Sequence, residues 1–119
     1  MNSLLLVAHG SRREQSNEEV RLLAEKLKHR CGENYPVIHA AFLEIANPLI
    51  PAGLQKCIDA GASKITVLPY FLNTGRHVAE DIPEIVEAFK QNADVEINIA
   101  AHLGASEMML DLLVGVAVE

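Results

Sequence analysis

Two histidines and a glutamate, far apart in this sequence, have side chains that could hold a metal ion together. His9 and Glu44 each follow an apolar run directly, and His77 follows a third run after a short polar segment. Imidazole and carboxylate ligands together suit Fe, Co and Ni, and three protein ligands leave coordination positions open for an incoming ligand. Neutral imidazoles also take up protons near physiological pH. The three residues therefore predict a metal site that can release its ion, in which His9 and His77 also act as acid-base groups.

Polar and basic residues surround these three candidates in the sequence. Ser11 and Arg12 follow His9, and residues 74–76 (Thr-Gly-Arg) precede His77. Arginines are ordinarily solvated surface charges, but here they would offset the net charge of −6 close to the metal site. Ser11, Arg12, Thr74, Gly75 and Arg76 are therefore the candidate contacts for a bound anionic molecule such as a polycarboxylate. The simpler alternative stays open for each histidine alone, namely a loop residue that hydrogen-bonds to the backbone.

Strand and helix patterns alternate along the whole chain, which predicts one α/β domain over residues 1–119. The apolar run 3–8 has no polar face, as expected of a strand buried on both sides of a parallel sheet. Segments in which apolar residues recur at helical spacing lie between this run and the later apolar runs. Four βα units with right-handed crossovers predict a three-layer, flavodoxin-like fold with strand order 2-1-3-4 and helices on both faces. The expected strands are 3–8, 35–43, 64–70 and 95–101.

This strand order determines where the candidate residues should meet. Open parallel sheets bind ligands beyond the carboxyl ends of their strands, at the point where the winding direction reverses. That point lies between the first and third strands. His9 and the segment 73–77 would then lie on one rim, with Glu44 at the end of the neighbouring second strand.

Several local signals predict where helices begin and end. Asn47 and Pro48 predict the start of the second helix, as cap and first-turn proline, and Gly61 predicts its end. Asp81 and Glu84 have the spacing of a capping box at the third helix. The apolar residues between 109 and 116 mark a last helix.

Composition and charge argue against some partners and compartments. Acidic residues are spread along the chain, which disfavours nucleic acid or an anionic membrane as a partner. No apolar stretch approaches the roughly 20 residues that span a bilayer, and the first apolar run is too short for a signal peptide. Cys31 and Cys57 lie in helical patterns and are expected to be free thiols. These features together predict a cytoplasmic protein.

The other histidines are weaker candidates. His29 is expected to face solvent, and His39 falls within the second strand, where a packing role is expected. His102 follows the fourth strand on the same rim as the proposed site, so it is held as a possible substrate contact.

Two motifs give the sequence a family resemblance. Residues 8–12 (AHGSR) follow the first strand, and residues 69–78 (PYFLNTGRHV) run into 81–83 (DIP). With 42–44 (FLE), Pro48 and 103–104 (LG), they span nearly the whole chain in order. The sequence resembles the short sirohydrochlorin chelatases, the CbiX and SirB group.

The resemblance implies a class II chelatase fold and ATP-independent insertion of Co²⁺ or Fe²⁺ into sirohydrochlorin, for cobalamin or siroheme synthesis. It also implies a homodimer in place of the two fused halves of longer relatives, with no permanently bound cofactor. His9 and His77 would hold the metal and assist deprotonation, and Glu44 is similarly implicated. Nickel-inserting relatives carry a histidine-rich segment that this sequence lacks, which lowers but does not remove nickel as the metal.

Three other functions compete with this one. A non-catalytic metal or tetrapyrrole carrier could use the same residues. A histidine phosphatase would place arginine immediately before the nucleophilic histidine, whereas Ala8 stands there. A nucleotide-binding module is weaker, because no phosphate-cradling glycine motif follows any strand.

Overall fold

The computed structural model describes residues 1–73 and 75–118, and for His77 it describes the backbone alone. Its centre is a parallel sheet of four strands in the order β2-β1-β3-β4, as the sequence predicts. The strands are β1 (Asn2–Ala8), β2 (Val37–Phe42), β3 (Lys64–Pro69) and β4 (Glu96–Ile99). β1 lies in the middle, where Leu5 pairs with His39 of β2 on one side and Val67 of β3 on the other.

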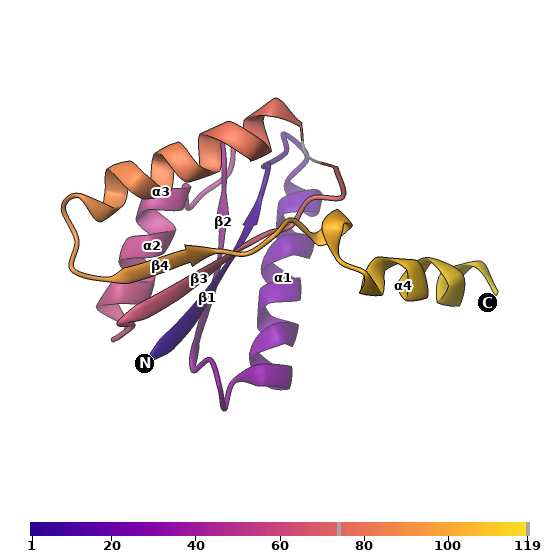
Figure 1. Ribbon diagram of the computed structural model, residues 1–119, viewed down its shortest axis with the longest axis horizontal. Coiled ribbons are helices and arrows are strands. Elements are labelled where there is room, and N and C mark those ends of the chain that lie inside the picture. Colours follow the sequence, from indigo (N-terminus) through magenta and orange to yellow (C-terminus); the bar gives the residue numbers. More distant parts are fainter. Residues whose placement is uncertain (74, 119) are drawn as a thin grey trace.

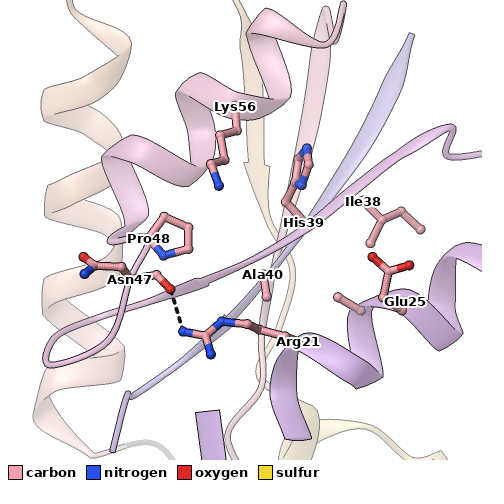
Figure 2. Close-up of a pocket in the computed structure, with 9 residues that line it drawn as sticks. Arg21, Glu25, Ile38, His39, Ala40, Asn47, Pro48 and Lys56 are labelled. Carbon is pink, nitrogen blue, oxygen red and sulfur yellow. Dashed lines mark hydrogen bonds between the residues drawn. The ribbon is translucent and has the colours of Figure 1, made fainter. Parts of the chain in front are cut away.

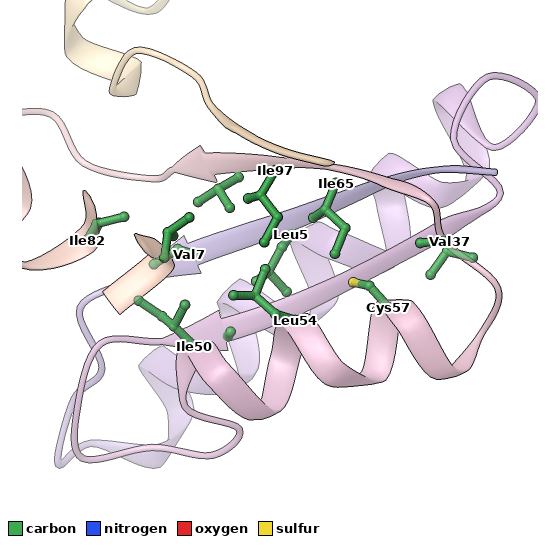
Figure 3. Close-up of a cluster of buried hydrophobic side chains, with 13 residues drawn as sticks. Leu5, Val7, Val37, Ile50, Leu54, Cys57, Ile65, Ile82 and Ile97 are labelled. Atoms are coloured by element: carbon green, nitrogen blue, oxygen red, sulfur yellow. The ribbon is translucent and has the colours of Figure 1, made fainter. Parts of the chain in front are cut away.

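Helices cover the sheet on both faces and make three layers (Figure 1). α1 (Glu14–Cys31) lies on one face, and α2 (Ile50–Asp59) and α3 (Ile82–Lys90) lie on the other. Successive side chains of a strand point to opposite faces, so β1 supplies both cores. Leu5 packs with Leu54 and Ile65 beneath α2 and α3 (Figure 3), whereas Leu4 and Leu6 pack beneath α1.

One predicted helix start is wrong, and at another helix the predicted capping bond does not form. α2 begins at Ile50 rather than at Pro48, because Leu49 has an extended backbone and is the N-cap; the Asn47–Pro48 peptide bond is cis. Pro51 takes the place of the first-turn proline, and Gly61, with φ of +106°, follows the helix end as predicted. Asp81 stands at the N-cap position of α3 as predicted, but it has helical dihedral angles and makes no side-chain capping hydrogen bond, because a π-helical turn, η1 (His77–Asp81), leads directly into α3.

The last helix forms as predicted but lies exposed at the edge of the molecule. A short 3₁₀ turn, η2 (Leu103–Ala105), follows β4, and α4 (Met108–Ala117) then projects away from the sheet (Figure 1). No residue of α4 is buried, although nearly all of its side chains are apolar.

Both cysteines are free thiols, as predicted. Cys57 is buried against the sheet, and burial raises the pKa of its thiol. None of the helices in residues 1–73 and 75–118 has the length and apolar character needed to span a bilayer.

Candidate functional site

His9 and Glu44 lie side by side at the carboxyl ends of β1 and β2. Backbone hydrogen bonds extend the ladder beyond both strands, since the Leu43 N–H donates to the Ala8 carbonyl (2.9 Å) and the Glu44 N–H donates to the His9 carbonyl (3.0 Å). The side chains then meet, with 3.0 Å between His9 Nε2 and Glu44 Oε1. Both stay accessible, at 49% and 58% side-chain exposure, so a ligand can reach them from solvent.

The backbone beside this pair is tightly packed and uses unusual dihedral angles. Gly10 has a φ of +97°, and a Cβ atom on it would lie 1.8 Å from the Glu44 carbonyl oxygen. The same carbonyl accepts a hydrogen bond from the Ala46 N–H at 2.8 Å, across Ile45 with φ of 71°. This is a γ-turn of the rare, strained kind, and strain of this type is often concentrated at functional sites. Only glycine permits the first loop to approach Glu44 so closely.

A buried asparagine holds the first loop, and sequence reasoning missed it. The Asn17 side chain accepts a hydrogen bond from the Ser11 N–H (2.9 Å) and donates to the Ser11 carbonyl (2.8 Å). Asn17 is 2% exposed and shares its face of α1 with buried Val20 and Ala24. Asn17 lies three residues before Val20 and seven before Ala24, so it falls on the same helical stripe as these apolar residues. A polar residue within an apolar stripe was the signal available in the sequence.

We expect Asn17→Ala to lower the free energy of unfolding by about 1–3 kcal/mol, because it leaves the Ser11 backbone groups unsatisfied in a part-buried place. Urea denaturation measures this change. Ser16→Ala on the same helix is the control, and an equal loss in both variants would mean that Asn17 does not clamp the loop.

Arg21 connects α1 to the loop that carries Glu44. Its guanidinium donates to the Asn47 carbonyl at 2.8 Å and lies 5.1 Å from the centre of the Phe42 ring. Hydrogen bonds from Arg21 and then Asn17 lower the pKa of Glu14 on the same helix. Arg21 therefore has a structural role beside the site.

The second motif reaches the same rim from β3. The Tyr70 N–H donates to the Val7 carbonyl at 2.8 Å, which places the end of β3 beside the end of β1. Gly75 has open space around it, and Arg76 directly precedes η1, with its side chain 86% exposed and its Nε 3.6 Å from Glu80 Oε2. The backbone of His77 begins η1. Thr74 lies outside the described residues.

The structure brings together two of the three residues predicted to bind a metal. His9 and Glu44 are in contact, Ser11 is fixed by Asn17, and Arg12 is exposed in the same loop. Among the described residues, no group of three or more His, Cys, Asp or Glu side chains could hold a metal ion. The third ligand, His77, stays a prediction, because only its backbone is described.

The other histidines lie apart from this pair. His29 is exposed, as predicted. His39 is half-buried at the β2 edge of the sheet, in a hollow that Arg21 and Lys56 also line (Figure 2). Burial, then the charges of Lys28 and Lys56, lower the pKa of His39, so its neutral form is favoured. His102 is half-buried just before η2, and its predicted substrate contact stays a prediction.

Comparison with known proteins gives a consistent result. The CbiX family model matches residues 3–118. The chain is 34% identical over 113 residues to a protein named sirohydrochlorin ferrochelatase, chloroplastic, from Arabidopsis thaliana, covering 94% of this chain and 49% of that protein. It is 31% identical over 139 residues to a sirohydrochlorin cobaltochelatase from Methanocaldococcus jannaschii, covering 96% of each chain.

A solved structure agrees with these matches. The sirohydrochlorin chelatase SirB from Bacillus subtilis subspecies spizizenii, in complex with cobalt, superposes with a TM-score of 0.83 and 30% identity, over 98% of this chain and 50% of SirB. The chain thus spans about half the length of several relatives and nearly the full length of another. Its fold, its two motifs and these matches show that the chain belongs to the CbiX family.

Proposed function

We propose that the protein inserts Co²⁺ or Fe²⁺ into sirohydrochlorin without ATP. The observation that carries this proposal is the exposed His9–Glu44 pair, held 3.0 Å apart by backbone bonds between neighbouring strands. Relatives of this chain are named as sirohydrochlorin cobaltochelatases and ferrochelatases, which supports both metals. Affinity order along the first-row metals favours copper and zinc at such sites, so supply in the cell selects the ion and Ni²⁺ stays possible.

The proposed reaction exchanges one metal ion for two pyrrole protons. His9, Glu44 and His77 first bind the ion, and their incomplete ligand set leaves positions for the pyrrole nitrogens. As the ion binds the four ring nitrogens, the two nitrogens that carry hydrogen each lose one proton, and His9 and His77 accept these two protons as the ion departs. Glu44 orients the His9 ring, because its carboxylate lies within hydrogen-bond distance of Nε2.

We also propose that two copies of the chain work as a homodimer in the cytoplasm. The chain covers about half the length of longer relatives, so two copies together would match one such relative. The two free thiols support a reducing compartment.

The direct test is an anaerobic insertion assay with sirohydrochlorin and Co²⁺, Fe²⁺ or Ni²⁺, followed by the absorbance spectrum. Purified protein should accelerate insertion of at least one metal over the spontaneous rate without ATP. A rate equal to the spontaneous one, with metal or tetrapyrrole binding retained, would instead show a carrier.

We expect Arg76→Ala to raise the Michaelis constant for sirohydrochlorin and to weaken its dependence on salt. The Arg76 side chain is 86% exposed, so its charge can attract an anionic substrate through solvent. Initial rates at low and high salt measure both effects. Arg30→Ala, at the far end of α1, is the matched control, and an unchanged Michaelis constant in Arg76→Ala would assign that arginine to ordinary surface charge.

A further inference from the structure

A hollow opens at the free edge of the sheet, beside the outer side of β2 (Figure 2). Its volume is about 380 Å³, within the range of about 300–1,000 Å³ that is typical of small-molecule sites. Side chains of α1 and α2 form its walls, and residues 47–48 line it toward the carboxyl end of β2. Neither His9 nor Glu44 lines it, so the hollow is separate from the candidate metal site.

The backbone of β2 offers a hydrogen-bond donor to this hollow. The Leu43 N–H donates to β1, whereas the Phe42 N–H donates to the Pro48 carbonyl on the outer side of the strand (2.9 Å). N–H groups of alternate residues point to the same side of a strand, so the Ala40 N–H also points outward. β2 is an edge strand, and among the described residues only the bridge between Phe42 and Leu49 pairs with its outer side. The Ala40 N–H is therefore available to a ligand.

Positive side chains surround the hollow, although the protein has a net charge of −6. Lys56 extends from α2 near the half-buried His39 ring (Figure 2), and the charge of Lys28 on α1 also acts on that ring. Neither lysine forms an ion pair within residues 1–73 and 75–118. Arg21 is already paired with two glutamates of α1, and Glu25 lines the hollow as an exposed carboxylate. Positive charge is thus in excess at this place.

We propose that the hollow binds a doubly charged phosphate group between Lys56, the protonated His39 and the Ala40 N–H. Cationic side chains and outward main-chain N–H groups are strong donors to anionic oxygens. With His39 protonated, the two lysines bring the positive charge to three, and Glu25 removes one. A phosphate dianion would therefore leave the hollow electrically neutral. This site goes beyond the proposed metal insertion, because it shares no residue with the metal site.

Binding should be accompanied by uptake of a proton at His39. Burial, then the positive charges of Lys28 and Lys56, lower the pKa of this imidazole in the free protein, whereas Glu25 raises it. A bound dianion would offset the effect of the lysines and favour the protonated ring. The affinity should therefore fall as the pH rises from the pKa of His39 in the free protein toward its higher pKa in the complex.

Nuclear magnetic resonance of the histidine ring protons tests the site, with His39→Gln identifying the His39 signal by its loss. Inorganic phosphate should shift that signal along a saturable curve, with a dissociation constant of about 1 mM or lower. Sodium chloride at equal ionic strength should not shift it in this way. Glycerol phosphate is the second probe. Tighter binding than that of inorganic phosphate would identify a phosphate ester as the ligand and weaker binding the free ion, and either result supports the site.

Lys56→Gln tests the contact from α2. It should weaken phosphate binding about tenfold or more, the effect of losing one charge-assisted hydrogen bond. Lys56 is exposed, so the variant should keep its fold, which circular dichroism checks. Lys26→Gln removes the same charge from an exposed position of α1 outside the hollow and should bind as wild type does. Equal weakening in both variants, or an unshifted His39 signal in the wild type, would overturn the proposal.

Sulfate tests the role of the proton on His39. It stays a dianion throughout the range in which histidine titrates, so a pH dependence of its binding comes from the protein. Sulfate should bind less tightly as the pH rises, and His39→Gln should bind it weakly at every pH. An affinity that does not change with pH in the wild type would contradict the proposed site. These measurements need neither metal nor tetrapyrrole, so their outcome is independent of the chelatase assay.

Discussion

His9→Ala and His77→Ala should each lower the rate of metal insertion by about 10²–10⁴-fold, the usual contribution of a positioned acid-base group. His9 also loses its contact with Glu44, so metal binding should weaken in that variant as well. Both changes should leave the free energy of unfolding nearly unaffected, because His9 is half exposed at the rim and His77 begins a helical turn next to a loop. Stopped-flow absorbance with sirohydrochlorin and Co²⁺ measures the rates.

His29→Ala is the matched control for both variants. It removes an exposed histidine from the opposite end of α1 and should keep the wild-type rate. If His9→Ala and His77→Ala also kept that rate, the metal site would have to lie elsewhere.

Gly10→Ala should lower the free energy of unfolding by about 2–5 kcal/mol. The added Cβ would overlap the Glu44 carbonyl oxygen at 1.8 Å, and alanine is strained at a φ of +97°. The loop must therefore move away from Glu44, which would also separate the His9 and Glu44 side chains and reduce metal binding. Urea denaturation and Co²⁺ titration measure the two losses.

Gly75→Ala is the control for the stability measurement, because nothing lies within 4 Å of the position of its Cβ. It should change the free energy of unfolding much less. Equal destabilisation of the two variants would mean that the close approach of Gly10 to Glu44 has no special cost.

The sheet and the contact between His9 and Glu44 could be predicted because both follow from simple periodicity. A continuous apolar run such as 3–8 is compatible with a strand covered on both faces, and alternation with helices leaves few topologies. Once the order 2-1-3-4 is known, the ends of the strands bring His9 beside Glu44. The sequence therefore predicted which strand ends would meet.

The missed features depend on backbone geometry and on contacts between separate segments of the chain. α2 starts at Ile50 because Leu49 rather than Asn47 has the extended backbone of an N-cap, and the residue types at Asn47 and Pro48 do not reveal this. Asn17 has helical periodicity like its apolar neighbours, so its hydrogen bonds to Ser11 became visible only in three dimensions. The close packing of Gly104 against Leu72, just before α4, is likewise a contact that no periodic pattern encodes.

The two described side chains of the candidate site, His9 and Glu44, are attached to main chain that backbone hydrogen bonds hold in place. His9 and Glu44 are one hydrogen-bonded rung beyond adjacent strands, and Gly10 locks against the turn that follows. The distance between these two residues is therefore set by the roughly 4.8 Å spacing of neighbouring strands and not by the conformation of a loop. A descendant of this protein that comes to prefer a different ion would have to change the donor atoms themselves, by exchanging one of these side chains for another, while the scaffold stays as it is.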